Sequence, residues 1–203
     1  MNLQELLKSF EGKSNSGKFG SVNFFRLKDD GDKAIVKILI SSEQDVLNYA
    51  KPVHMVEING YQNKVLCLDN DECECCKAGV KKTLKIMLPM YNMDTKQVEL
   101  WERGINQVKD LQVMLGKYGD LAKHSFEVIR SGKAKSKDTK YTMMYDPTPT
   151  DVDVNSLEVP KVTGRDFKLI LELTPEQQRE AMLEGKVTWG SKQAQVDDTD
   201  VPF

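Results

Sequence analysis

The chain of 203 residues has no long hydrophobic run, and this absence limits where it can work. No segment approaches the roughly 18 to 20 consecutive apolar residues that span a bilayer, so we expect no membrane partner. The first residues, MNLQEL, include an acid and lack the basic-then-apolar layout of a secretory signal peptide. The sequence therefore predicts a cytoplasmic protein, in a compartment that keeps thiols reduced.

The arrangements that carry metal-assisted hydrolysis are also missing. The chain has two histidines, and neither has a glutamate beside it to act as the general base of a zinc hydrolase. Asp29, Asp30 and Asp32 form an acidic triplet, but Asp-Asp-Gly-Asp is typical of a hairpin turn. We therefore expect a protein that is not an enzyme.

Charge of one sign does not dominate, since the net charge is −2. Its distribution is uneven, however. Residues 130–140, RSGKAKSKDTK, contain five basic residues and one acid, and Lys77, Lys81, Lys82 and Lys85 form a second basic cluster. Residues 174–203 are acidic. The sequence thus places an acidic tail on a body with local positive patches.

Short strand-like runs dominate what is present. Two β-rich runs flank Asp30-Gly31 and predict a hairpin, and further short strands precede the single well-marked helix at 105–118. Two more strands follow that helix, joined by the basic loop. This order predicts a mainly β protein: a five-stranded oligonucleotide-binding (OB) barrel with an inserted zinc-binding subdomain and a few short helices. A β-sandwich or an α+β sheet is an alternative with nearly the same pattern.

The predicted domain organisation has three parts. Residues 1–18 form an N-terminal arm, and residues 19–173 form the barrel core with the zinc subdomain at about 53–82. Residues 174–203 form a helix followed by a disordered acidic tail. The helix is marked by Thr174, Pro175 and Gln177, a capping box with proline at the first helical position, and by Gly185 at its end.

Cysteine is absent everywhere except in residues 67–76. His54, Cys67, Cys73 and Cys76 follow the spacing H-x12-C-x5-C-x2-C, and the predicted hairpin around Gly60 brings the first two together. Three thiolates and one imidazole suit a closed, tetrahedral, structural Zn²⁺ site. Cys75 is left over and is an alternative ligand in place of Cys73 or Cys76. Four thiols without metal, or an iron–sulfur cluster, are the competing interpretations.

These ligands, set among short strands, resemble those of the zinc-containing single-stranded-DNA-binding proteins of tailed phages, the helix-destabilising replication proteins. The run SFEVIRSGKAKSKDTKYTMMY is similar to the closing strands of such a barrel, and the terminus DDTDVPF is similar to the acidic Pro-Phe tails of bacterial single-stranded-DNA-binding proteins. The shorter last ligand gap, the extra Cys75 and the lack of a clear basic N-terminal arm depart from the phage pattern. The resemblance implies a protein of the infected bacterial host's cytoplasm that coats single-stranded DNA in phage replication, recombination and repair.

Binding single strands needs cations for phosphates and flat side chains for bases. Candidates lie on the predicted strands and in the basic loop: Phe25, Arg26, Lys37, Tyr91, Trp101, Arg103, Arg130, Lys133, Lys135 and Tyr141. For each aromatic residue, packing in the core is the competing interpretation. For the lysines of the loop, it is a solvated hairpin tip.

The acidic terminus suggests a partner site, with self-association on DNA a further expectation. Its charges repel DNA, while its apolar end and terminal carboxylate form a hook for a basic, apolar pocket on a replication or recombination protein. The residues concerned are Asp197, Asp198, Asp200, Pro202 and Phe203. Alternatives for the whole chain are a zinc-containing RNA- or duplex-DNA-binding regulator, a non-catalytic zinc-ribbon fragment of a replication enzyme, and a structural zinc scaffold.

Overall fold

The computed structural model describes residues 22–133, 138–148, 150–164 and 169–189. These residues form a mainly β structure with one mixed sheet of eight strands and a few short helices. The chain divides into two compact units: residues 1–51 with 84–161, and residues 52–83 with 162–203. We call them unit 1 and unit 2. None of the described helices has the length and apolar character needed to cross a membrane.

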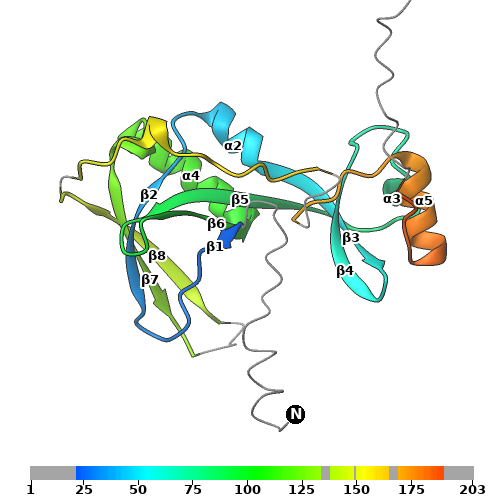
Figure 1. The fold of residues 1–203 in the computed structure, drawn as a ribbon, viewed down its shortest axis with the longest axis horizontal. Coiled ribbons are helices and arrows are strands. Elements are labelled where there is room, and N and C mark those ends of the chain that lie inside the picture. The colour runs from blue at the N-terminus through cyan, green and yellow to red at the C-terminus, as the bar shows by residue number, and fades with distance from the viewer. Residues whose placement is uncertain (1–21, 134–137, 149, 165–168, 190–203) are drawn as a thin grey trace, which may run out of the picture. The chain divides into compact units, whose positions relative to one another are not determined.

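The elements of unit 1 are numbered as in Figure 1. Strands β5 and β3 each run across a unit boundary. The described elements are β1 (Asn23–Phe24), β2 (Lys33–Ile38), α2 (Glu43–Tyr49), β5 (Lys82–Asn92), β6 (Gln97–Gly104), α4 (Ile105–Tyr118), η1 (Leu121–Lys123), β7 (Ser125–Ser131), β8 (Lys140–Asp146) and η2 (Val154–Ser156).

The sheet of unit 1 is antiparallel except at one edge. β2 pairs with β5 on one side and β7 on the other, β5 pairs onward with β6, and β7 pairs with β8. At the edge, β1 pairs with β6 in parallel. The path therefore runs β1-β6-β5-β2-β7-β8 and is open, and no pairing between β6 and β8 closes it within the described residues. The predicted OB barrel is not confirmed.

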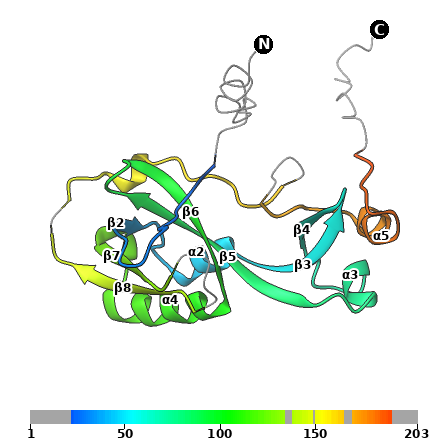
Figure 2. The ribbon, with the colours of Figure 1, turned by 90° about the horizontal axis from the view of Figure 1, so that it is seen from below.

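Two local predictions in unit 1 have different outcomes. The helix expected at 105–118 is α4, which ends at Gly119 (φ 69°) and packs against α2 and the end of β6 (Figure 2). The hairpin expected around Asp30-Gly31 is wrong, because β1 pairs with β6 and β2 pairs with β5 and β7. The turn itself forms, since the Asp32 carboxylate accepts the N–H groups of Lys28 and Asp29 at 2.8 Å each.

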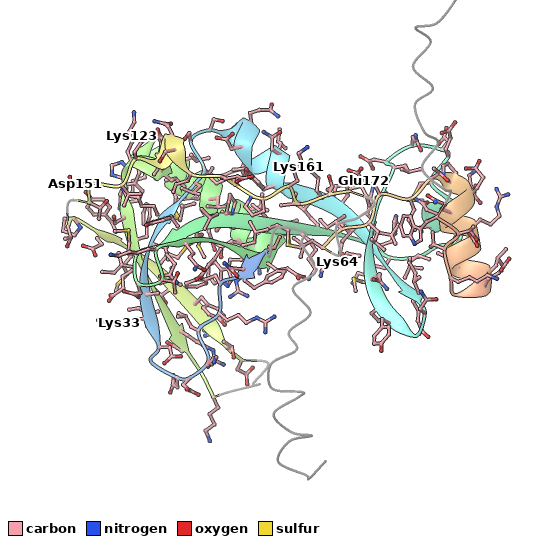
Figure 3. The ribbon with its side chains drawn as sticks, viewed as in Figure 1. Lys33, Lys64, Lys123, Asp151, Lys161 and Glu172 are labelled. Atoms are coloured by element: carbon pink, nitrogen blue, oxygen red, sulfur yellow. The ribbon has the colours of Figure 1, made fainter. Side chains whose placement is uncertain are left out.

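The core of unit 1 lies where the sheet meets α4. Alternate residues of β2, Ala34, Val36 and Ile38, are buried there together with Leu88 of β5 and Leu111 of α4. Residues two apart lie on one face of a strand, and an amphipathic helix buries one stripe of its side chains, so the two elements share this core. On the opposite face of β2, Lys33 (labelled in Figure 3) pairs with Glu127 of β7 at 2.9 Å.

Unit 2 is built on one hairpin and two helices. β3 (Ala50–Ile58) and β4 (Tyr61–Leu66) are joined by Asn59-Gly60, both with positive φ, as a two-residue hairpin requires. The two helices, α3 (Glu74–Lys77) and α5 (Pro175–Glu184), lie side by side (Figure 1). The predicted capping box and the αL glycine Gly185 (φ 64°) of α5 are confirmed.

A segment distant in sequence completes unit 2. Leu171 donates its N–H to Lys64 O at 2.8 Å and accepts the N–H of Leu66 at 2.9 Å, so residues 169–173 run along β4. Figure 3 labels Lys64 and Glu172 on these two neighbouring segments. The buried side chains of unit 2 form a small cluster: Val56, Ile58, Val65, Cys67, Cys73, Cys75, Leu173 and Ala181.

Candidate metal centre and nucleic-acid residues

Four potential ligands converge in unit 2. His54 lies on β3, Cys67 follows β4, Cys73 caps the start of α3, and Cys76 lies within α3. Their ligand atoms all lie within 4.8 Å of one another. The hairpin supplies the first two ligands and the short helix the other two. The structure thus brings together the four residues that the spacing predicted.

The spacing of these atoms fits a tetrahedral zinc ion. Cys67 Sγ lies 3.9 Å from Cys73 Sγ and 3.6 Å from Cys76 Sγ. His54 Nε2 lies 3.6 Å from Cys73 Sγ and 3.5 Å from Cys76 Sγ. With Zn–S near 2.3 Å and Zn–N near 2.0 to 2.1 Å, a regular tetrahedron has S···S edges of about 3.8 Å and N···S edges of about 3.6 Å. Four of the six ligand–ligand distances are therefore close to those around one tetrahedral ion, and the other two are at most 4.8 Å.

His54 is oriented by the backbone. Its ring is fully buried, and Nδ1 lies 2.9 Å from the carbonyl oxygen of Val80. Because a carbonyl only accepts hydrogen bonds, Nδ1 must carry the proton, and the lone pair is then on Nε2. Nε2 is the atom that faces the sulfurs, so the imidazole is held in the tautomer that binds a metal.

The thiols have distinct environments. Cys73 is fully buried, and burial alone acts to raise the pKa of its thiol. Hydrogen bonds from the backbone of Cys76 and Leu68 and with the thiols of Cys76 and Cys67 outweigh this and lower the pKa. Cys67 Sγ also accepts the N–H of Asp69 at 3.4 Å. The donors around Cys73 favour its thiolate, the form that a metal binds, whereas burial and the contacts with Cys67 and Cys73 raise the pKa of the Cys76 thiol to about 12.

Cys75 lies outside the ligand cluster. It is fully buried among the apolar residues of unit 2, and this burial, followed by the charges of Cys73 and Cys67, raises the pKa of its thiol to about 11. Cys75 therefore packs as a small apolar side chain. The geometry selects Cys73 and Cys76 as the ligands of this segment.

Helix α5 supports the cluster through a residue that the sequence did not indicate. The side chain of Gln178 is fully buried. Its Oε1 accepts the N–H of Cys75 at 3.4 Å and lies 3.5 Å from Cys73 Sγ, and its Nε2 donates to Leu66 O at 3.3 Å. Glu74 adds a surface contact with Arg179 at 3.2 Å. The capping box predicted the helix, but no signal in the sequence predicted what it packs against.

Three of the predicted nucleic-acid residues belong to the core of unit 1. Phe25 and Trp101 are each 3% exposed, and their rings meet edge to face with centroids 5.5 Å apart. Phe25 therefore presents no face to a base. Lys37 is also buried, which lowers the pKa of its ammonium group. Lys37 lies on the central strand β2, Trp101 lies on β6, and Phe25 follows the edge strand β1.

Arg130 also has a packing role in the structure. It is buried, and its guanidinium donates to Lys28 O at 2.6 Å, to Lys133 O at 3.1 Å and to Thr139 Oγ1 at 3.2 Å. These bonds tie the turn before β2 to both ends of the basic loop. The guanidinium thus binds three acceptors of the protein itself, and its contact with a phosphate stays a prediction.

Arg103 lies between two aromatic rings. Its guanidinium carbon is 3.9 Å from the centroid of Trp101 and 4.0 Å from that of Tyr141, and the two rings are 5.1 Å apart. Burial lowers the pKa of the guanidinium, although it stays charged at neutral pH. Trp101 and Arg103 lie on β6 and Tyr141 lies on β8, so this stack links two strands that do not pair.

The remaining predicted residues lie at the surface or outside the described residues. Arg26 and Lys133 are exposed, Arg26 lying 5.8 Å from the ring centroid of the exposed Phe24, and Tyr91 is half-buried on β5. Lys135 and the N-terminal arm lie outside the described residues, as do the five predicted partner residues, Asp197, Asp198, Asp200, Pro202 and Phe203.

Comparison with known proteins adds no relationship to this geometry. No protein-family model matches the chain, and a search of the curated proteins found no match.

Proposed function

We propose that the protein binds single-stranded DNA without sequence preference and coats it during phage DNA replication, recombination and repair. The observation that carries the proposal is the strand order of unit 1. In chain order, the five antiparallel strands of unit 1 are β2, β5, β6, β7 and β8, and helix α4 lies between the third and the fourth. The first strand lies between the second and the fourth, and the fourth pairs with the fifth. This is the order of the OB fold, a partly open Greek-key barrel.

The Trp101–Arg103–Tyr141 stack supports this interpretation. An OB barrel closes between its third and fifth strands, which here are β6 and β8. The ring centroids of Trp101 and Tyr141 lie 5.1 Å apart although these strands do not pair. The OB fold binds oligonucleotides on the face of its second and third strands and in the loop between its fourth and fifth strands. In this chain those parts are β5, β6 and the basic loop after β7.

The cluster of His54 and three cysteines supports a structural Zn²⁺ site within the proposal. Four protein ligands leave no open position for a substrate, and zinc bound there would cross-link the β3–β4 hairpin to α3. We infer that the ion stabilises unit 2 and that the protein is a binding protein without catalytic activity. We further propose that the terminus DDTDVPF recruits replication or recombination proteins.

Titration with labelled DNA tests the proposed function. Full-length protein is titrated with a fluorescent oligo-dT and with a duplex of equal length at two salt concentrations. We expect preference for the single strand and a logarithmic salt slope of about −0.7 for each phosphate contacted. Equal affinity for both probes, preference for one duplex sequence, or turnover of the probe would contradict the proposal.

Two sets of variants locate the binding surface in the same titration. Lys133→Ala with Lys140→Ala removes two exposed cations at the ends of the basic loop and should flatten the salt slope. Lys123→Ala, an exposed lysine of η1 (labelled in Figure 3), is the matched control and should leave the slope unchanged. Deletion of residues 197–203 should leave the affinity equal or higher, because it removes three acids.

A further inference from the structure

The N-terminus of helix α4 opens into a pocket of about 580 Å³ in unit 1. The helix has 14 residues, and its cap residue Gly104 makes no side-chain hydrogen bond to the first turn. The first turn contains no acidic residue. The cap residue therefore supplies no side-chain acceptor to the first N–H groups of the helix, and no acid of the first turn neutralises the positive end of the helix dipole.

A second, independent feature of the pocket indicates a ligand. Gln107 lines the pocket and is 9% exposed, yet its side-chain Nε2 has no hydrogen-bond partner. The Nε of Arg103, which lines the same pocket, is also buried without a partner. Buried donors without acceptors are unfavourable, and several that meet in one pocket indicate an acceptor supplied from outside.

The charges of the pocket favour an anion. Arg103 comes from β6 and Lys140 from β8, and both carry positive charge. Asp110 is the acid among the lining residues and lies in the second turn of α4, beyond the free N–H groups. The donors include Arg103, Gln107, Lys140 and the backbone of the first turn. A group that accepts hydrogen bonds in several directions and carries negative charge fits this set, which is the chemistry of a phosphate.

We propose that this pocket binds one backbone phosphate of single-stranded DNA at the N-terminus of α4. The identification of DNA as the source of the phosphate rests on the function proposed above. The site lies beside Tyr141, whose ring stacks on Arg103, so the phosphate enters next to the contact between β6 and β8. The site contacts a phosphate and no base. It therefore does not distinguish between DNA sequences, as binding without sequence preference requires.

Asn106→Asp separates binding from folding. Asn106 is exposed, lines the pocket and is the second residue of the helix. A carboxylate there repels phosphate but interacts favourably with the helix dipole, so the melting temperature should stay equal or rise. Gln112→Glu is the matched control, since it adds the same charge to an exposed position of the same helix outside the pocket.

The test follows the backbone amide signals by NMR as inorganic phosphate is added to metal-loaded, full-length protein at constant ionic strength. We expect the amides of residues 105–107 to shift in the wild type and in Gln112→Glu. In Asn106→Asp the apparent affinity for phosphate should fall about 10-fold or more, because a charge-assisted contact is replaced by repulsion. Unshifted amides in the wild type, or equal shifts in Asn106→Asp, would overturn the site.

A second arm identifies the source of the phosphate. Asn106→Asp should bind unphosphorylated oligo-dT more weakly than the wild type and lower its salt slope by about 0.7, one phosphate contact. An effect confined to 5′-phosphorylated oligonucleotides, or none on DNA, would overturn the assignment to a backbone phosphate. If the wild type binds inorganic phosphate but no DNA, the proposed function fails and the anion site stands, so the two failures are distinguishable.

Discussion

Cys75 and Cys76 are neighbours in the chain, but their sulfur atoms have different surroundings. Cys76 Sγ lies 3.6 Å from Cys67 Sγ and 3.5 Å from His54 Nε2, at the distances expected around one zinc ion. Cys75 is fully buried against apolar residues. One residue of the pair is thus placed as a ligand and the other as part of the core.

The pair provides a prediction about metal content. Cys76→Ala should bind less than one zinc per chain and lose the thiolate charge-transfer bands of the cobalt-substituted protein, because it removes one of four ligands. Cys75→Ala should keep one metal per chain and the same bands, while costing about 1 kcal/mol of stability for the lost buried sulfur. Elemental analysis and absorption spectra check both variants. Equal metal loss in the two would show that Cys75 is a ligand.

Residue spacing predicted the ligand set because a C-x2-C pair and a hairpin confine four atoms to a small volume. The spacing left Cys75 as an alternative ligand, because it does not show in which direction each of two adjacent side chains points. Helix α3 sets these directions in the structure. Gln178 was not predictable, since its contacts with Cys75 and Leu66 span 103 and 112 residues. The sequence could not show that Phe25 and Arg130 are buried, because the same residue types also occur at nucleic-acid-binding surfaces.

Helices α2 and α5 begin with the same device in different units. Ser42 and Asp45 form a capping box at α2, and Thr174 and Gln177 form one at α5. In each box the hydroxyl accepts the N–H of the third helical residue, while that residue's side chain accepts the N–H of the cap. The two helices thus allow the stability of each unit to be changed by an equivalent substitution.

Ser42→Ala and Thr174→Ala form a reciprocal pair of predictions. Each should cost about 1 kcal/mol, the typical cost of losing a hydroxyl cap. Native-state hydrogen exchange should show weaker protection in α2 for the first variant and in α5 for the second. Because α5 supplies Gln178, Thr174→Ala should also release zinc to a chelator faster. Identical changes in both helices for both variants would contradict a division into two units.

Element positions were predictable where the signal is local. The capping box and the terminating glycine that marked α5 act within one turn, so they can be identified directly in the sequence. Strand partners depend on distant segments. β1 pairs with β6, more than 70 residues away, although the sequence favoured a hairpin with β2. The strand propensities of the two segments do not indicate that Asn23 pairs with Glu99 in a parallel register.

At the scale of the whole molecule, the two units have cores of different kinds. The buried cluster of unit 1 includes Trp101, Phe126 and several large aliphatic residues. The cluster of unit 2 consists of eight buried residues, three of which are cysteines. So small a core rarely supplies enough stability to fold alone. A structural zinc site contributes on the order of 10 kcal/mol, which is comparable to the stability of a whole domain.

Metal removal should therefore unfold one unit and spare the other. After chelation in reducing buffer, we expect amides of β4 and α5 to lose protection from hydrogen exchange, because the ligands that join the hairpin to α3 are released. Amides of β2 and β7 should keep theirs, since these strands pack on a core without metal ligands. Chelator already saturated with zinc is the control and should change nothing. If protection in unit 2 survives verified loss of the metal, its hairpin and helices fold without an ion, and a structural role for zinc is wrong.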